Sequence, residues 1–534
     1  MKSNNSEKIY IFDTTLRDGQ QSPGAGLTFE DNIVYADYAD KLNIDILEAG
    51  FPSASQTDFK IVKYISERMA KRKSNMIISG LCQLREPQAE ITMKALEASK
   101  KIGKARVHTY FPVDPNLLKA SLAGKPLDPD NTIETLYKIV SLATKEGYEV
   151  EFSPEGYSRI GENFDFTTDL IRAAVSAGAK VINCPDTIGG ACIREGEEYF
   201  VRKMQNHADL MKKEFPNQEI IWSAHCHNDF GLALENTMNS VFDGPVRQIE
   251  GCINGVGERA GNAALEQCII YLREFGHTGN NHFHTDININ YLKSTSDFIA
   301  EKMLPRQPHS PIVGDNATRH TSGGHTNAIL KNPLAYQPFD PKEIGSDISF
   351  VFGPLSGSNH AKNIIEEFGY SCPNDKKAAI AQFIKDEYHD RRKGITDLEL
   401  VSAYKKYHHP IKPKKISYTK TEAGDVKLKI DGQFFDQNNI EALYKGENSA
   451  LAALRDAVKK YMPEISINDY RSESINSKSV DAHSRSTIIV KYNDELYKGV
   501  AVDSDIEISA LKAYIDAVNK TYVEQNCKLT VEEK

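Results

Sequence analysis

The most constraining feature of this sequence is a rhythm that repeats eight times between residue 8 and about residue 275. Short runs of apolar or β-branched residues alternate with longer amphipathic segments, and each run ends in polar or small residues. The runs are YIFDTT (10–15), ILEAGF (46–51), IISGL (77–81), RVHTYF (106–111), VEFSPE (150–155), VINCPD (181–186), IIWSAHCH (220–227) and QIEGCING (248–255). Eight strands followed by helices over this length predict an α/β fold, the (β/α)8 barrel.

The segments between the runs carry helix boundary signals. Thr28 precedes a helical pattern that extends to Lys41, and Asp31 follows it by three residues, which is close to a capping box. The pattern over 166–177 ends at Gly178, a residue type that often terminates helices. We therefore expect helices in both places.

The chain continues well beyond this barrel, since 534 residues exceed the ~250–300 at which single cores stop growing. Residues 320–365 are rich in Gly, Ser, His and Asn, which predicts ordered loops with short helices. HHPIKPKK (408–415) predicts a linker, because its prolines and lysines disfavour a helix or a central strand. We expect a catalytic barrel over 8–280, a helical linker region over 281–410 and a further domain over 415–530.

The last of these domains is predicted to be a compact α+β module. A strand is expected over 415–430 and helices over 449–461 and 508–522. Residues 486–492 and 496–502 should pair as a hairpin across Asn493 and Asp494. Two halves of strand and helix indicate an internal duplication, although the sequence identity between them is weak.

The charge balance argues against nucleic acid and membrane as partners. A formal net charge of −9 and a pI of about 6.0 leave no positive field for phosphate backbones or anionic lipid. No stretch approaches the ~20 apolar residues that span a bilayer, and MKSNNSEK lacks the apolar core of a signal peptide. The eight cysteines form no CxxC pair, so we expect reduced thiols and a cytoplasmic location.

In a (β/α)8 barrel the active site lies at the carboxyl ends of the strands, so the polar residues that close the runs should converge there. These residues are Arg17, Asp18, Glu48, His108, Thr109, Ser153, Glu155, Asp186, Thr187, His225, His227, Asn254, Glu258 and Asn262. His225 and His227 stand at i and i+2, which places both imidazoles on one face of a strand. With the Asp18 carboxylate and the Asn262 amide oxygen they predict an open site for a divalent cation.

Each of these residues also has a structural interpretation. An HxH pair alone fits core packing equally well, but its place on the seventh run, with Asp18 after the first, favours a metal site. Arg17 can be the ion-pair partner of a neighbouring carboxylate, whereas beside a metal it would stabilise an oxyanion. His108 and Thr187 can be satisfied polar residues under a loop, although strand ends favour substrate contact. GVGERAGNAALE (255–266) fits a turn before a helix, or backbone N–H groups that receive an anion.

Several motifs together closely resemble the 2-isopropylmalate synthase family. They are FDTTLRDGQQSPG (12–24), EAGFP (48–52), VHTY (107–110), EFSPE (151–155), PDTIGG (185–190), HCHNDFGLALEN (225–236) and NGVGERAGNAALE (254–266). Past the barrel, HTSGGHTNAILKNPLAYQPFDPKEIG (320–345) is similar to the family's linker, and 415–530 to its amino-acid-sensing regulatory domain. The resemblance implies condensation of acetyl-CoA with 3-methyl-2-oxobutanoate and thioester hydrolysis to 2-isopropylmalate and CoA, the committed step of leucine biosynthesis.

The resemblance also assigns roles to residues. The implied metal ligands are Asp18, His225, His227 and Asn262, and the implied catalytic residues are Arg17, Glu155, His325 and Tyr336. His108, Ser153 and Thr187 would bind the 2-oxo acid. His325 would help to remove a methyl proton from acetyl-CoA and Tyr336 would serve the hydrolysis, both from a partner subunit, which requires at least a homodimer. The alternative is that His320 and His325 are a structural loop pair.

The implied cofactors are a divalent cation (Zn, Mn or Mg) and an activating monovalent cation, with acetyl-CoA as co-substrate and leucine as effector.

Some positions depart from the family pattern. Gly156 replaces an Asp, 188–190 is Ile-Gly-Gly, and Gln20 replaces a Glu, changes that bear on specificity. GENSALAAL (446–454) replaces a glycine-proline turn, while VDSDIEISALKAYIDAVN (502–519) keeps the pattern, which leaves leucine inhibition open.

Other functions remain as alternatives. Citramalate and homocitrate synthases share the metal ligands and differ in the pocket for the 2-oxo acid, but the EFSPE run and the full C-terminal domain favour isopropylmalate. A hydroxyacyl-CoA lyase runs the same chemistry backward and would not need a sensing domain. A degenerate barrel kept as a regulator would gain nothing from an open metal site.

Overall fold

Eight parallel strands close into a barrel in the computed structural model, which describes residues 6–279, 282–391, 394–445, 449–475 and 483–529. The strands follow the order of the chain, and β2 pairs with both β3 and β9 to complete the ring. They are β2 (Tyr10–Asp13), β3 (Ile46–Glu48), β4 (Ile77–Gln83), β5 (Ala105–Pro112), β6 (Glu149–Glu155), β7 (Val181–Asp186), β8 (Ile221–Cys226) and β9 (Val246–Gly251). Each predicted run overlaps one strand, so the predicted barrel is confirmed.

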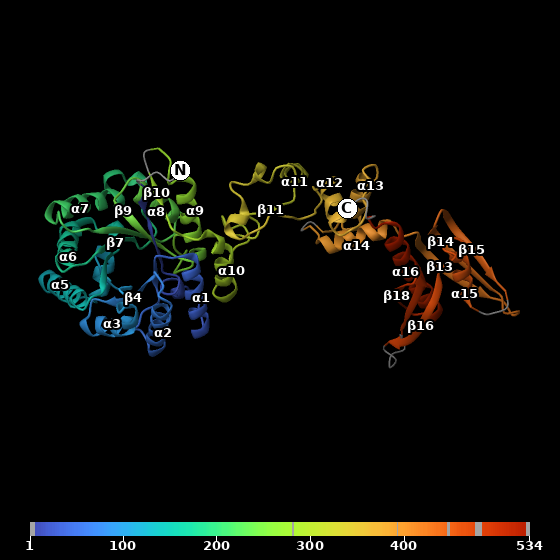
Figure 1. Cartoon of the computed structure of the whole chain (residues 1–534), viewed down its shortest axis with the longest axis horizontal. Coiled ribbons are helices and arrows are strands. Elements are labelled where there is room, and N and C mark those ends of the chain that lie inside the picture. Colours follow the sequence, from blue (N-terminus) through green and yellow to red (C-terminus); the bar gives the residue numbers. More distant parts are fainter. Residues whose placement is uncertain (1–5, 280–281, 392–393, 446–448, 476–482, 530–534) are drawn as a thin grey trace. The chain divides into compact units, whose positions relative to one another are not determined.

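Helices follow the strands and surround the barrel, as Figure 1 shows for the blue to green part of the chain. They are α1 (Phe29–Leu42), α2 (Gln56–Arg72), α3 (Glu86–Lys100), α5 (Pro129–Lys145), α6 (Phe164–Ser176), α7 (Phe200–Glu214), α8 (Ala233–Phe242) and α9 (Leu265–Phe275), with α4 (Pro115–Ser121) before α5 and α10 (Leu292–Lys302) after α9. The expected capping box is present at α1, where Thr28 and Asp31 bond each other's backbone N–H groups. Gly178, at φ +100°, follows the end of α6 as predicted.

Barrel strands are buried on both faces, which is why the sequence shows continuous apolar runs instead of an alternating pattern. All six residues of β7 are buried, and so are the five central residues of β6. The inward faces also carry buried polar side chains, among them Arg106, Glu151, Gln248 and Glu250. A short parallel pair, β1 (Glu7–Lys8) with β10 (Phe283–His284), joins the two ends of this region.

Two compact units make up the chain. The first consists of Met1–Thr318 with Asp340–Asp347, and the second of Arg319–Phe339 with Ile348–Lys534. The second unit starts with the short elements expected for this irregular region: β11 (Arg319–His320), α11 (Gly323–Ile329) and β12 (Ser349–Phe350). The helices α12 (Ser358–Glu367), α13 (Lys377–Glu387) and α14 (Asp397–Tyr407) then share a core that includes Ile364, Ile380 and Leu400.

The C-terminal module repeats one arrangement twice, with three antiparallel strands followed by a helix. The first copy is β13 (Ile411–Lys420), β14 (Val426–Phe434), β15 (Gln437–Tyr444) and α15 (Ala450–Lys459). The second is β16 (Ser466–Ile475), β17 (His483–Tyr492), β18 (Glu495–Asp503) and α16 (Ile506–Asn526). A single core contains side chains from both copies. The α+β class is confirmed, and the repeated topology supports the internal duplication.

Two local predictions in this module were wrong. The segment 408–415 is not an open linker, because β13 begins at Ile411. Proline is tolerated there since β13 is an edge strand and its register shifts between Pro413 and Lys415. The single strand expected over 415–430 is the hairpin of β13 and β14, while β15 and β16 were missed. The predicted hairpin across Asn493 and Asp494 is confirmed, with both residues at positive φ.

Within the described part of the chain, none of the helices combines the length and the apolar character needed to cross a bilayer.

Gly446–Asn448, the start of the segment that replaces the family's glycine-proline turn, lies outside the described residues.

Candidate active site

A pocket of about 150 Å³ opens at the carboxyl ends of the barrel strands. Eight of the predicted site residues line it: Arg17, Asp18, His108, Ser153, Glu155, Thr187, His225 and His227. They come from strands far apart in the sequence, and barrel closure brings them together. The predicted convergence of strand-end side chains at one end of the barrel is therefore present for these eight residues.

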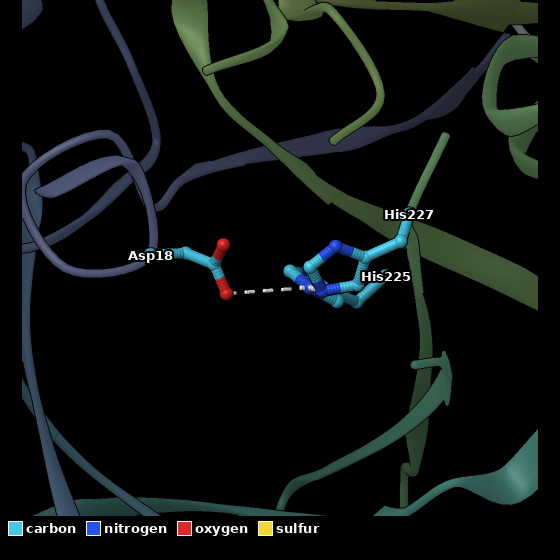
Figure 2. Close-up of side chains that lie close together, drawn as sticks. All are labelled: Asp18, His225 and His227. Atoms are coloured by element: carbon cyan, nitrogen blue, oxygen red, sulfur yellow. Dashed lines mark hydrogen bonds and ion pairs between the residues drawn. The ribbon is translucent and has the colours of Figure 1, made fainter. Parts of the chain in front are cut away.

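Asp18, His225 and His227 form the cluster drawn in Figure 2. Asp18 lies in the turn after β2, His225 lies in β8 and His227 follows that strand. One ligand atom of each lies within 4.8 Å of the others. His225 Nε2 is 3.7 Å from Asp18 Oδ2 and 3.3 Å from His227 Nε2, so both imidazoles turn the same nitrogen toward one point.

The electrostatics of the cluster suit a cation. Burial lowers the pKa of both His225 and His227 to about 4, so both rings are neutral at pH 7 and offer lone pairs. Burial alone would raise the pKa of Asp18, but Arg17 and the two histidines lower it to about 2. A carboxylate and two neutral imidazoles are a common donor set for a divalent cation. The residues present fit such an ion.

Asn262 adjoins this cluster through its amide nitrogen. Its Nδ2 donates to Asp18 Oδ1 at 2.7 Å and to the Val256 carbonyl at 3.0 Å, while its Oδ1 is buried without a hydrogen-bond partner. Gly257 permits this approach, because a Cβ there would overlap Asn262 Nδ2 and lie 3.0 Å from Asp18 Oδ1. Gly257 of the GVGERAGN run thus allows Asn262 and Asp18 to pack closely against the backbone.

Arg17 is held by two carboxylates at the edge of the pocket. Its Nε donates to Glu48 Oε2 at 2.5 Å and its Nη1 to Asp18 Oδ2 at 2.7 Å. Although burial lowers it, the pKa of Arg17 is raised by Glu48 and Asp18. The pKa of Glu48 falls to about 2, because Arg17 and His108 outweigh the effect of burial. Arg17 is therefore an ion-pair partner and a pocket residue at once.

His108 on β5 connects Glu48 on β3 with Ser153 on the neighbouring strand β6. Its Nδ1 lies 2.7 Å from Glu48 Oε1 and its Nε2 lies 2.7 Å from Ser153 Oγ. Ser153 Oγ accepts from Asn183 Nδ2 at 2.9 Å. All four side chains are buried. This chain of hydrogen bonds fixes the polar side of the pocket before any ligand enters.

Thr187 and Gly156 explain one departure from the family pattern. Thr187 Oγ1 accepts from the Gly156 N–H at 2.9 Å, and the Thr187 carbonyl accepts from Arg259 Nη2 at 2.6 Å. Gly156 has a φ of +77°, and a Cβ there would lie 2.5 Å from Asp114 Cβ. An aspartate at this position would collide with the start of α4.

Two further polar residues singled out in the sequence have structural partners. Asp186 is fully buried and accepts from Ser158 Oγ and from the backbone N–H groups of Gly190 and Ala191. Gln20 donates to the Leu16 carbonyl and to Asn32 Oδ1, which fastens the turn that carries Asp18. Glu155, in contrast, lines the pocket, and burial raises its pKa despite the opposing effect of Arg17.

His325 and Tyr336 belong to the second unit. Their rings stack with centroids 4.0 Å apart, and the side chain of Tyr336 is 51% exposed. His320 lies 6.2 Å from His325 between ring centroids and contacts Gln337 Nε2 at 2.8 Å. His320 thus lies in β11 and is partly buried, whereas His325 on α11 and Tyr336 form a stacked pair that is exposed to solvent.

Sequence reasoning missed several lining residues: Gln21, Phe51, Leu81, Tyr110, Asn183 and Pro185. Three of them could have been found from the two-residue period of a strand. Asn183 and Pro185 lie on one face of β7, four and two residues before Thr187, and Tyr110 follows His108 by two residues on β5.

Comparisons with known proteins cover nearly the whole chain. The HMGL-like family model matches residues 8–299, the homocitrate synthase post-HMGL domain-like model matches 312–393, and the LeuA allosteric (dimerisation) domain matches 378–522. A 2-isopropylmalate synthase of Aquifex aeolicus is 34% identical, over 97% of this chain and 96% of its own length. One from Pyrococcus abyssi is 33% identical, over 93% and 99%. A solved HMG-CoA lyase structure from Bacillus subtilis aligns over 57% of this chain and 96% of its own, at 18% identity and a TM-score of 0.45.

Proposed function

Because this chain belongs to the 2-isopropylmalate synthase family, we propose that it condenses acetyl-CoA with 3-methyl-2-oxobutanoate and hydrolyses the thioester to give 2-isopropylmalate and CoA. This reaction would make it an acyltransferase at the first committed step of leucine biosynthesis. The observation that carries the proposal is the strand-end pocket, in which Asp18, His225 and His227 lie beside a hydrogen-bonded polar wall.

Asp18, His225 and His227 would hold the divalent cation, with Asn262 as a fourth residue beside Asp18. When bound, Zn, Mn or Mg would polarise the ketone of the 2-oxo acid as a Lewis acid. Arg17 would stabilise negative charge that develops on the ketone oxygen, since its ion pairs keep the guanidinium charged and immobile.

The remaining pocket residues would bind and orient the 2-oxo acid. His108, Ser153 and Thr187 offer the polar contacts, and Phe51, Leu81 and Pro185 offer apolar surface for an isopropyl group. Glu155 would hold substrate or help a proton transfer, because it lines the pocket and burial raises its pKa.

The acetyl group must lose a methyl proton before it attacks the ketone. We assign this step to His325 and the later thioester hydrolysis to Tyr336, supplied by the partner subunit of a homodimer. Their exposed, stacked arrangement supports the assignment, because both rings are accessible to a second chain. The match to an allosteric dimerisation domain supports the dimer and a regulatory role for 415–530. We propose leucine as the effector.

The test is a thiol-release assay with purified protein, acetyl-CoA and one of three acids: 3-methyl-2-oxobutanoate, pyruvate or 2-oxoglutarate. We expect release that is selective for 3-methyl-2-oxobutanoate, lost with a chelator, restored by Zn, Mn or Mg, and lowered by leucine. Added K⁺ tests for a monovalent activator. Preference for pyruvate would indicate a citramalate synthase, and preference for 2-oxoglutarate a homocitrate synthase. Absence of release with all three would contradict the synthase and favour a lyase or a regulator.

A further inference from the structure

A buried carboxylate that does not line the pocket adjoins the cluster of Asp18, His225 and His227. Glu250 stands on β9 in register with His225 on β8, so the two side chains are neighbours on the inner face of the barrel. Glu250 Oε2 lies 3.5 Å from His225 Nδ1. Both atoms are buried, and neither has a hydrogen-bond partner. Buried polar atoms are normally paired, so two that face each other require an explanation.

The other oxygen of this carboxylate is already engaged. Glu250 Oε1 accepts from Ser223 Oγ at 3.1 Å and from Gln248 Nε2 at 3.4 Å. Gln248 is held in turn, because its Nε2 donates to Glu151 Oε1 and its Oε1 accepts from Arg106 Nη1. Neither Glu250 nor these supporting residues line the pocket, so substrate binding does not account for them.

The orientation of the His225 ring indicates a role for Glu250 Oε2, which faces its Nδ1. His225 Nε2 points to Asp18 and His227, and a nitrogen that binds a cation must carry no proton. The proton of the neutral ring then belongs on Nδ1, where it needs an acceptor. We propose that Glu250 is a positioning residue of the metal centre, which accepts the Nδ1–H of His225 and so fixes the tautomer and ring orientation that present Nε2 to the cation.

This inference rests on the proposed metal site and assigns a function to a residue outside the ligand set. It also predicts what an isosteric amide would do. In Glu250→Gln, the amide oxygen would stay toward Ser223 and Gln248, because both donate to that position. The NH2 group would then face His225 Nδ1 and favour the other tautomer, whose proton occupies Nε2.

The experiment measures metal binding by the full-length protein after chelator treatment. Free Mn²⁺ is followed by its EPR signal during titration of the wild type, Glu250→Gln, Glu250→Ala and the control Glu266→Gln. Glu266 is also a buried barrel carboxylate, but it bonds the Asn254 N–H and touches none of the proposed ligands. We expect the Kd for Mn²⁺ to rise about 10–100-fold in both Glu250 variants and to stay unchanged in the control.

A second readout separates positioning from general stability. Mn²⁺ should raise the Tm of the wild type and the control, and raise that of the Glu250 variants less at the same concentration. The absorption spectrum of bound Co²⁺ should also change in Glu250→Gln. If Glu250→Ala does not fold, the isosteric variant decides. A Kd within twofold of wild type with an unchanged Co²⁺ spectrum would overturn the role of Glu250, whereas a wild type that binds no Mn²⁺, Zn²⁺ or Co²⁺ would overturn the metal site as well.

Discussion

Arg17 forms ion pairs with two of the carboxylates at the pocket, Asp18 and Glu48. It touches Asp18 of the cation cluster and Glu48, which in turn contacts His108 of the polar wall. A lysine has a single ammonium group and cannot reproduce the planar fork that meets two carboxylates. Arg17 therefore couples the two halves of the pocket by geometry as well as by charge.

Substitution of Arg17 by Lys should lower kcat by about 10²–10³-fold, the usual effect of losing an oriented charge stabiliser. Steady-state thiol release measures this effect, and circular dichroism checks the fold. The control is Arg68→Lys on α2, which changes a partly exposed arginine that pairs with Asp37. Equal kcat values for Arg17→Lys and wild type would exclude Arg17 from transition-state stabilisation.

The close approach of Asp114 to Gly156 predicts that a side chain at position 156 would destabilise the fold. Restoring the family's usual residue with Gly156→Asp combines a positive φ with a Cβ 2.5 Å from Asp114 Cβ. We expect a loss of about 2–4 kcal/mol in the free energy of unfolding, the sum of backbone strain and overpacking. Urea unfolding measures it.

The matched control for this prediction is Gly24→Asp. Gly24 has a φ of +83°, but a Cβ there would meet no atom within 4 Å. Gly24→Asp should therefore lose only the part of the free energy of unfolding that comes from backbone strain, about 1–2 kcal/mol. If both variants lose the same free energy, contact with Asp114 is not the reason for glycine at position 156.

At the scale of elements, α16 belongs to two cores. Leu511, Tyr514 and Val518 pack with the sheets of the C-terminal module, whereas Val523 and Cys527 at its end pack with α12, α13 and α14. One continuous helix thus fastens the repeated module to the helical region. Glu524 strengthens this junction, because its carboxylate accepts from Tyr370 at 2.6 Å and from Lys405 at 2.8 Å.

Glu524→Gln should destabilise the second unit in a pH-dependent way. Burial alone would raise the pKa of Glu524, but hydrogen bonds from Lys405, Tyr370 and Lys528 lower it to about 2, below the 4.5 of the unfolded chain. The contribution of this carboxylate is therefore complete above about pH 4.5 and is lost as the pH falls through about 2. The difference in Tm between variant and wild type should be largest near neutral pH and shrink on acidification.

The control for this helix is Glu507→Gln. Glu507 lies in the first turn of α16 and pairs with Lys420 in a partly exposed ion pair. Such pairs contribute little to stability. A Tm loss in Glu524→Gln that does not vary with pH would contradict the electrostatic account of the junction.

At the scale of the whole molecule, the proposed site draws residues from two chains. Co-expression of His225→Ala with His325→Ala tests this directly, because each variant alone should be inactive. In mixed dimers the intact barrel of one chain would meet the intact His325 of the other. Random pairing gives half mixed dimers with one working site of two, so about a quarter of wild-type activity is expected. Activity no higher than that of the single variants would place His325 in its own barrel or outside catalysis.

Metal removal should affect activity far more than the fold. The barrel core is formed by buried apolar side chains of its strands and helices. Chelator treatment should therefore abolish thiol release and leave the far-ultraviolet circular dichroism unchanged, with a Tm loss no larger than ligand linkage allows. Unfolding after chelator treatment would instead show that the cation is required for the fold.

What the sequence determined by itself was the order and kind of elements in the barrel, because those signals are local. Apolar runs marked the eight strands, Thr28 with Asp31 marked a helix start, and Asn493 with Asp494 marked a hairpin turn. Strand-end placement also indicated Asp18, His225 and His227 as neighbours, since a closed barrel brings those ends together.

Only the tertiary structure decided what depends on register and neighbours. Pro413 lies in a strand because that strand is at an edge, and Gly156 is required because α4 approaches it. Glu250 follows its strand partner His225 by 25 positions in the chain, and nothing local marks the pair as neighbours. Hydrophobic periodicity determines which face a side chain takes, whereas the register between adjacent strands of the barrel determines which of their side chains meet.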